Sequence, residues 1–152
     1  MIFLSERDST FFQGINNEII NNVIETSINI FKLVIGNHGD SEDIYGENVD
    51  KFYKTGVIIN CLILREDLNT TTSTFGTNTT QFAKFAINRN QIKEKNIYPE
   101  VGDICEWNGL FFEINNVNEN QYIMGRPEYN HSIIINAHST NVSNTNLGER
   151  NQ

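Results

Sequence analysis

The sequence predicts a mainly β domain, a small β-barrel or sandwich with one helix at its N-terminus. Three observations lead to this fold class. Short apolar runs separated by turn residues follow one another from residue 56 to residue 138. One stretch, residues 9–25, instead repeats its apolar residues with a helical period. The chain of 152 residues, 38% of them hydrophobic, is long enough for one core and too short for two. We therefore expect a single domain over 1–152 with its β core at 56–138.

The N-terminal helix is predicted over residues 9–25, where either Ser9 or Thr10 could cap its first turn. Its large aliphatic and aromatic side chains recur every three or four residues, so they gather near one face. We expect this apolar face to pack on the core or on a neighbouring molecule. The face consists of Phe12, Ile15, Ile19 and Val23, with Ile20 and Ile24 beside it.

A strand is predicted at 28–35, and an acidic loop follows it at 40–55. Loops of this length in a compact domain are either functional or disordered. Tyr45, Phe52 and Tyr53 argue against simple disorder, because a solvated segment has little use for three aromatic side chains.

The predicted β core begins with a dense apolar run at 56–67, typical of a strand that is covered on both faces. The Thr/Asn-rich residues 68–80 are expected to form an exposed loop or a hairpin tip. Asn108-Gly109 between two apolar runs is the strongest hairpin signal in the chain. The other predicted elements are a strand at 82–87, a helical turn at 89–95, strands at 104–107, 110–117, 122–125 and 132–137, and a flexible tail at 139–152.

The formal net charge of −8 makes the chain a poor candidate for binding nucleic acid, because affinity for phosphate comes from clustered Lys and Arg. The N-terminus has no continuous apolar segment typical of a signal peptide, and no run is long enough to cross a membrane. Cys61 and Cys105 lie in apolar runs without metal-ligand spacing, so we expect two buried free thiols. Free thiols suit synthesis in a reducing cytoplasm.

No catalytic motif is present, and His38, His131 and His138 stand apart in the sequence. We therefore expect no enzyme, no cofactor and no metal site. Asp103 and Glu113 could form a carboxylate pair across a hairpin, but a turn explains Asp103 better, through bonds to nearby backbone amides. Glu113 is expected to be a strand-edge or intersubunit residue.

An oligonucleotide-binding barrel or a carbohydrate-binding sandwich is the alternative among binding modules. Such a barrel needs cations interleaved with exposed aromatic residues on one face. Lys84 and Arg89 are nearly the only cations close to the candidate aromatics, so the charge balance disfavours it. Those aromatics are Phe75, Phe82, Phe85, Trp107 and Phe111.

Four short motifs follow one another in a fixed order along the chain. They are "IYGE" at 44–47, "FG" at 75–76, "PEVGD" at 99–103 and "FEINNV" at 112–117. In this order, and over a span from Phe12 to His138, the chain resembles the neck proteins of T4-like bacteriophages, which complete the head below the portal. Its second half is similar to the head-tail joining, or stopper, proteins of tailed phages. The chain departs from longer members of that family after Val117, where its last strand is short and its tail is rich in Asn and Ser.

The resemblance implies a structural, non-enzymatic virion protein of the head-tail connector. Such a protein forms a cyclic ring of six or twelve copies, contacts portal or portal-adaptor proteins on one side and tail-terminator or tail-tube proteins on the other, and retains the packaged DNA. Double-stranded DNA would pass through an acidic lumen without specific binding, because like charges repel. A tail terminator or a portal adaptor of the same assembly is the alternative, although adaptors are largely helical.

The resemblance also implies interface or structural roles for the motif residues. Tyr45-Gly46-Glu47 would anchor the acidic loop on the barrel or on the adjacent subunit; the alternative is that Tyr45 fills its own core. The complete set is Tyr45, Gly46, Glu47, Phe52, Tyr53, Phe75, Gly76, Pro99, Gly102, Asp103, Phe112 and Glu113.

Overall fold

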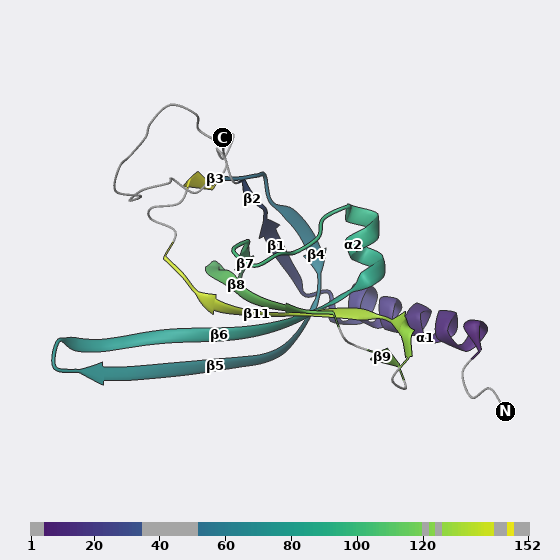
Figure 1. The fold of residues 1–152 in the computed structure, drawn as a ribbon, viewed down its shortest axis with the longest axis horizontal. Coiled ribbons are helices and arrows are strands. Elements are labelled where there is room, and N and C mark those ends of the chain that lie inside the picture. Colours follow the sequence, from purple (N-terminus) through teal and green to yellow (C-terminus); the bar gives the residue numbers. More distant parts are fainter. Residues whose placement is uncertain (1–4, 35–51, 120–121, 124–125, 142–145, 148–152) are drawn as a thin grey trace.

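The computed structural model describes residues 5–34, 52–119, 122–123, 126–141 and 146–147. Its main feature is one antiparallel sheet of seven strands, flanked by the helix α1 and the short helix α2 (Figure 1). The prediction of a mainly β domain with one N-terminal helix is confirmed. In order across the sheet, the strands are β4 (Val57–Asn60), β1 (Ser27–Phe31), β7 (Ile104–Trp107), β8 (Leu110–Asn118), β11 (Ser132–Ser139), β6 (Gly76–Asn88) and β5 (Leu62–Ser73).

The two edges of this sheet, β4 and β5, are consecutive in the chain and are separated by Cys61 alone. Up to Asn60 the chain pairs with β1, and from Leu62 onward it pairs with β6. The sheet therefore curves until its edges meet at one residue, but no ladder between β4 and β5 closes it. The predicted single strand at 56–67 is in fact two edge strands, because the chain changes partner halfway.

The core lies on the concave side of the curved sheet and is built by alternate residues of its strands. In β11, residues 133–137 alternate between buried and half-buried positions. Phe85, Phe112 and Trp107 meet in this core with ring centroids 6.0–6.3 Å apart. Its fully buried members are Ile28, Ile30, Ile59, Cys61, Phe85, Ile87, Cys105, Phe112, Ile114, Ile133, Ile135 and Ala137.

The local turn chemistry follows the sequence closely. Asn108 and Gly109 both have positive φ, 52° and 76°, which is the backbone of a tight hairpin turn between β7 and β8. The predicted helical turn at 89–95 is α2 (Arg89–Lys95), which ends at Asn96 in the left-handed conformation.

The N-terminal helix begins earlier than predicted. It consists of α1 (Glu6–Glu18) and a π-helical turn, η1 (Ile19–Ile24). Ser5, rather than Ser9 or Thr10, is the cap: its hydroxyl accepts from the Asp8 amide while the Asp8 carboxylate accepts from the Ser5 amide. Ser9 instead lies within α1, and its side chain is buried.

The Thr/Asn-rich segment is a hairpin tip, and its strands are much longer than predicted. Residues 68–73 and 76–81 pair with each other in β5 and β6. Since β11 pairs with β6 only as far as Phe82, residues 68–81 form a two-stranded ribbon, which we call the arm. The arm projects from the body of the domain (Figure 1).

Small additional strands lie outside the main sheet. The predicted strand at 28–35 is divided between β1 and β2 (Leu33–Val34), and β2 pairs with β3 (Phe52–Tyr53), so the end of the predicted acidic loop is a strand. Ser139 belongs to β11, and β12 (Asn146–Leu147) pairs with β3, so these parts of the predicted flexible tail are β structure. Of the predicted strand at 122–125, the described part is β9 (Tyr122–Ile123), which pairs with β10 (Arg126–Asn130); residues 124–125 lie outside the described residues. None of the described helices could cross a bilayer, because none combines sufficient length with sufficient hydrophobicity.

Candidate interaction surfaces

Asp103 is the centre of a buried polar junction between the PEVGD turn and the start of β2. Its side chain is almost completely buried, and its two oxygens accept from the Leu33 amide at 2.9 Å, the Glu100 amide at 2.8 Å and Lys32 Nζ at 2.8 Å. The Asp103 backbone carbonyl accepts from the Ile114 amide at 2.9 Å. This carboxylate is fully engaged in holding two segments together, so it is not available as a catalytic acid or base.

Lys32 is the cation of this junction. Partial burial lowers the pKa of its ammonium group, but hydrogen bonds and charge interactions with Asp103 and Glu100 outweigh that effect and leave the pKa raised. Lys32 in turn lowers the pKa of Glu100, through a hydrogen bond of 2.8 Å and through its charge. Nζ also donates to the Tyr98 carbonyl at 2.7 Å.

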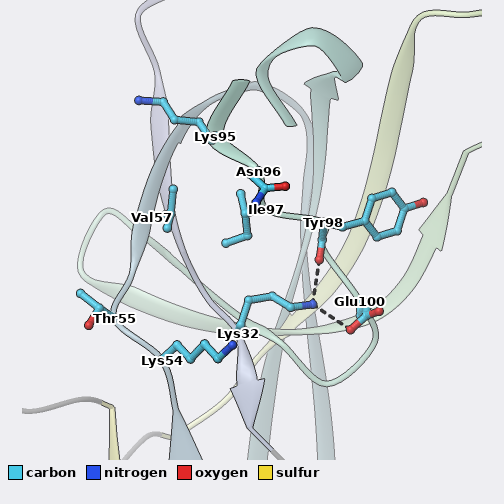
Figure 2. Close-up of a pocket in the computed structure, with 9 residues that line it drawn as sticks. All are labelled: Lys32, Lys54, Thr55, Val57, Lys95, Asn96, Ile97, Tyr98 and Glu100. Carbon is cyan, nitrogen blue, oxygen red and sulfur yellow. Dashed lines mark hydrogen bonds and ion pairs between the residues drawn. The ribbon is translucent and has the colours of Figure 1, made fainter. Parts of the chain in front are cut away.

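A pocket of about 340 Å³ lies beside the junction (Figure 2). Lys32, Lys54 and Lys95 contribute to its wall, with Ile97 and Val57 supplying apolar surface. Lys32 turns toward Glu100 and the Tyr98 carbonyl, whereas the Lys95 side chain extends away from them (Figure 2). Lys32, the most buried of these cations, is already paired with Glu100 and Asp103.

The predicted site residues of the acidic segment are only partly described. Tyr45, Gly46 and Glu47 lie outside the described residues. Phe52 and Tyr53 form β3, and Tyr53 is buried with no hydrogen-bond partner for its hydroxyl among the described residues. Burial, and secondarily the charges of Glu113 and Asp103, raise the pKa of that hydroxyl.

Phe75 and Gly76 lie at the tip of the arm. The Phe75 ring is fully exposed, and Gly76 has a φ of 132°, which side chains rarely adopt. Leu68, at the base of the arm, is also exposed. The tip thus presents one large apolar side chain at the end of a polar ribbon, far from the aromatic cluster of the core.

The remaining predicted site residues lie in the turn before β7 and in β8. Pro99 and Phe112 are fully buried. Gly102 has a φ of 94°, and its amide donates to the Ile114 carbonyl at 3.0 Å. Glu113 belongs to β8, which lies between β7 and β11, so the expectation of a strand-edge position is wrong.

The two cysteines are completely buried free thiols, as predicted. Burial raises the pKa of Cys61 to about 12 and also raises that of Cys105. Among the described residues no group of three or more His, Cys, Asp or Glu side chains could hold a metal ion. His138 instead contacts Asn115 Oδ1 at 2.6 Å.

Amide side chains form a row of contacts between α1–η1 on one side and the strands β4 and β6 and helix α2 on the other. The sequence analysis did not predict these contacts. Asn88 Nδ2 donates to Asn17 Oδ1 at 2.7 Å, and Asn60 Nδ2 donates to Asn21 Oδ1 at 3.1 Å. Gln91 also donates to Asn21 Oδ1. These polar residues could have been found, because Ser9, Gln13, Asn17 and Asn21 repeat every four residues along the predicted helix. We call these contacts the amide seam.

The amide seam turns the apolar face of the helix outward. Phe11, Phe12, Ile15, Ile19 and Val23 are between 38% and 73% exposed, and the buried residues of the helix are Ser9 and Ile20. These five side chains therefore do not pack on the core of their own domain, and packing on a neighbouring molecule, the other expectation for this face, stays a prediction. The polar side of the helix faces the sheet because hydrogen-bonded amides satisfy one another there.

Searches with protein-family models and against curated proteins found no match to this chain.

Proposed function

We propose that this chain is a structural protein of a bacteriophage neck, a head-tail connector that closes the DNA-filled head below the portal and provides the platform for tail attachment. The four ordered motifs of the sequence are the starting point for this proposal. The observation that supports it best is the arm, residues 68–81, a two-stranded ribbon that extends beyond the sheet.

The arm extends into solvent without packing on the rest of the domain, which is unusual for a ribbon of two strands. A two-stranded ribbon is only marginally stable by itself in water, and the exposed ring of Phe75 gains nothing from its position in a monomer. Both properties suit an element that becomes covered when subunits assemble or when a neighbouring virion protein docks. In the proposed role, copies of the chain form a cyclic ring of six or twelve, contacting portal or adaptor proteins and tail-terminator or tail-tube proteins.

The electrostatics are consistent with a conduit for DNA. The net charge of −8 disfavours tight binding of phosphate, so double-stranded DNA could move past the ring without adhering. The protein would be made in the host cytoplasm and would end in the virion.

Electron microscopy of the purified chain mixed with portal complexes of the same phage tests the proposal. We expect rings seated on the portal. A variant with Asn-Gly in place of residues 69–80 keeps the Leu68–Gln81 pair and should fold but fail to form these rings. Portal complexes that remain bare with the intact chain would refute the neck role.

Deletion of the gene separates neck closure from the alternative of a tail terminator. Leaking or tail-less heads beside finished tails are expected for a neck protein, whereas overlong tails would identify a terminator.

The fold weakens the alternative of a binding module, because some of the aromatic residues that it would need on the surface are buried. Phe85 is buried, and Trp107 packs against Phe85 and Phe112 in the core. Phe75 lies at the tip of the arm, away from them. Titration with single-stranded DNA at low salt is expected to give no binding; salt-dependent binding would favour this alternative.

A further inference from the structure

We propose that the outward face of α1 is a self-association surface, on which a second copy of this chain packs its own α1 in antiparallel orientation about a two-fold axis. This inference concerns the free protein in solution and does not rest on the neck role. The surface consists of Arg7, Phe11, Gly14 and Glu18 along one line of the helix, with Phe12 and Ile15 beside it.

The first step is that the helix cannot turn this face inward. Asn17 and Asn21 are held by Asn88, Asn60 and Gln91 through the amide seam. Asn17 lies about a quarter of a turn around the helix from the line of Arg7, Phe11, Gly14 and Glu18. Rotating the helix to bury Phe11 would leave these partly buried amides without partners. The apolar face is thus fixed toward the outside, where only another molecule can cover it.

The second step is the spacing of the four residues on the line. Arg7, Phe11, Gly14 and Glu18 follow one another at intervals of four, three and four, so they share one face of an α-helix. All four are exposed. Among the described residues, neither Arg7 nor Glu18 has an ion-pair partner.

The third step is that this line of residues is complementary to the same line on a second, antiparallel copy of α1. With a two-fold axis between Phe12 and Gln13, Arg7 lies opposite Glu18 of the partner subunit, and Phe11 lies opposite Gly14 of the partner subunit. The same register produces both matches, and two-fold symmetry repeats each of them. Arg7 is the one cation of α1, and this register places it opposite an acid at the other end of the partner's helix.

Gly14 supports this register independently of charge. A glycine in the middle of a helix weakens it, and a Cβ added at Gly14 would meet nothing within 4 Å in the single chain. The space above Gly14 is open in the monomer and would receive the Phe11 ring of the partner subunit in the dimer. An anionic membrane is a poor occupant of this face, because α1 carries three carboxylates, Glu6, Asp8 and Glu18, and one arginine.

Sedimentation equilibrium of the full chain, over a concentration series from about 1 to 300 μM, tests the proposal. We expect a reversible monomer–dimer equilibrium. Arg7→Glu and Glu18→Arg should each weaken dimerisation by about tenfold or more, and the double variant should recover the original constant to within about threefold. Phe11→Asp should abolish the dimer, whereas Phe75→Asp, the same change at another exposed aromatic residue, should leave it unchanged.

The Gly14→Gln variant distinguishes an effect on helix packing in the dimer from an effect on the stability of the single chain. Glutamine is a better helix former than glycine, so the variant should unfold at a higher temperature while its dimer weakens by about tenfold or more. A chain that stays monomeric throughout the series, a dimer that survives Phe11→Asp, or a double charge reversal that restores nothing would overturn the proposal.

Discussion

Lys32 Nζ and Asp103 Oδ2 are 2.8 Å apart and join two segments that are 71 residues apart in the sequence. The lysine follows β1, and the aspartate closes the PEVGD turn before β7. Because the same carboxylate also accepts from the Leu33 and Glu100 amides, the pair sets the position of β2 relative to that turn.

Asp103→Asn is predicted to destabilise the domain by about 3 kcal/mol. The substitution removes the charge opposite Lys32 and leaves an amide group facing two backbone donors in a buried site. Chemical denaturation at neutral pH measures the change. Glu100→Gln is the control: it also contacts Lys32, but its side chain is mostly exposed, so a loss of less than about 1 kcal/mol is expected. Equal losses for both variants would contradict this account.

Asn21→Ala is predicted to destabilise the domain by about 2 kcal/mol, because Asn21 Oδ1 accepts from both Asn60 and Gln91 in the amide seam. Asn22→Ala, one residue further along η1 and exposed, should change stability by less than about 0.5 kcal/mol. Thermal unfolding of the two variants makes the comparison. A small effect of Asn21→Ala would mean that the seam does not hold the helix in place.

Gly102→Ala is predicted to cost about 2 kcal/mol. Its φ of 94° is unfavourable for any side chain, and the added Cβ would lie 3.3 Å from Leu33 Cδ2. Gly14→Ala, in an open helical position, should instead stabilise the fold by up to about 1 kcal/mol. Denaturant titration of both variants would reveal the opposite signs, and a neutral Gly102→Ala would argue against strain at the turn.

Alkaline pH is predicted to unfold the domain through its buried thiols. Cys61 has a pKa of about 12 in the fold against an ordinary value of 9.0, so the unfolded chain loses this proton first. The contribution of the buried, protonated Cys61 thiol to the free energy of unfolding is therefore complete below pH 9. It is lost as the pH rises toward 12, by about 1.4 kcal/mol per pH unit. The free energy of unfolding between pH 8 and pH 11 measures the slope. Cys61→Ala should give a shallower slope; an unchanged slope would show that Cys61 does not contribute.

Sequence patterns of short range determined much of this fold. The apolar alternation of residues 132–137, the Asn108-Gly109 turn and the helical period near the N-terminus each depend on neighbours only a few residues away, so their elements could be predicted. The burial of both cysteines followed in the same way, from their apolar surroundings in sequence.

Contacts between distant segments could not be read from such patterns. The change of partner at Cys61 depends on where β1 and β6 lie, and the function of Asp103 depends on Lys32, so both required the tertiary structure. The helix is the clearest case. Its period predicted an apolar face, but the side that faces the sheet was decided by amides at residues 60, 88 and 91, which meet the helix only in the folded chain. A periodic pattern identifies the two faces of a helix, whereas the hydrogen-bond partners across the contact decide which face is buried.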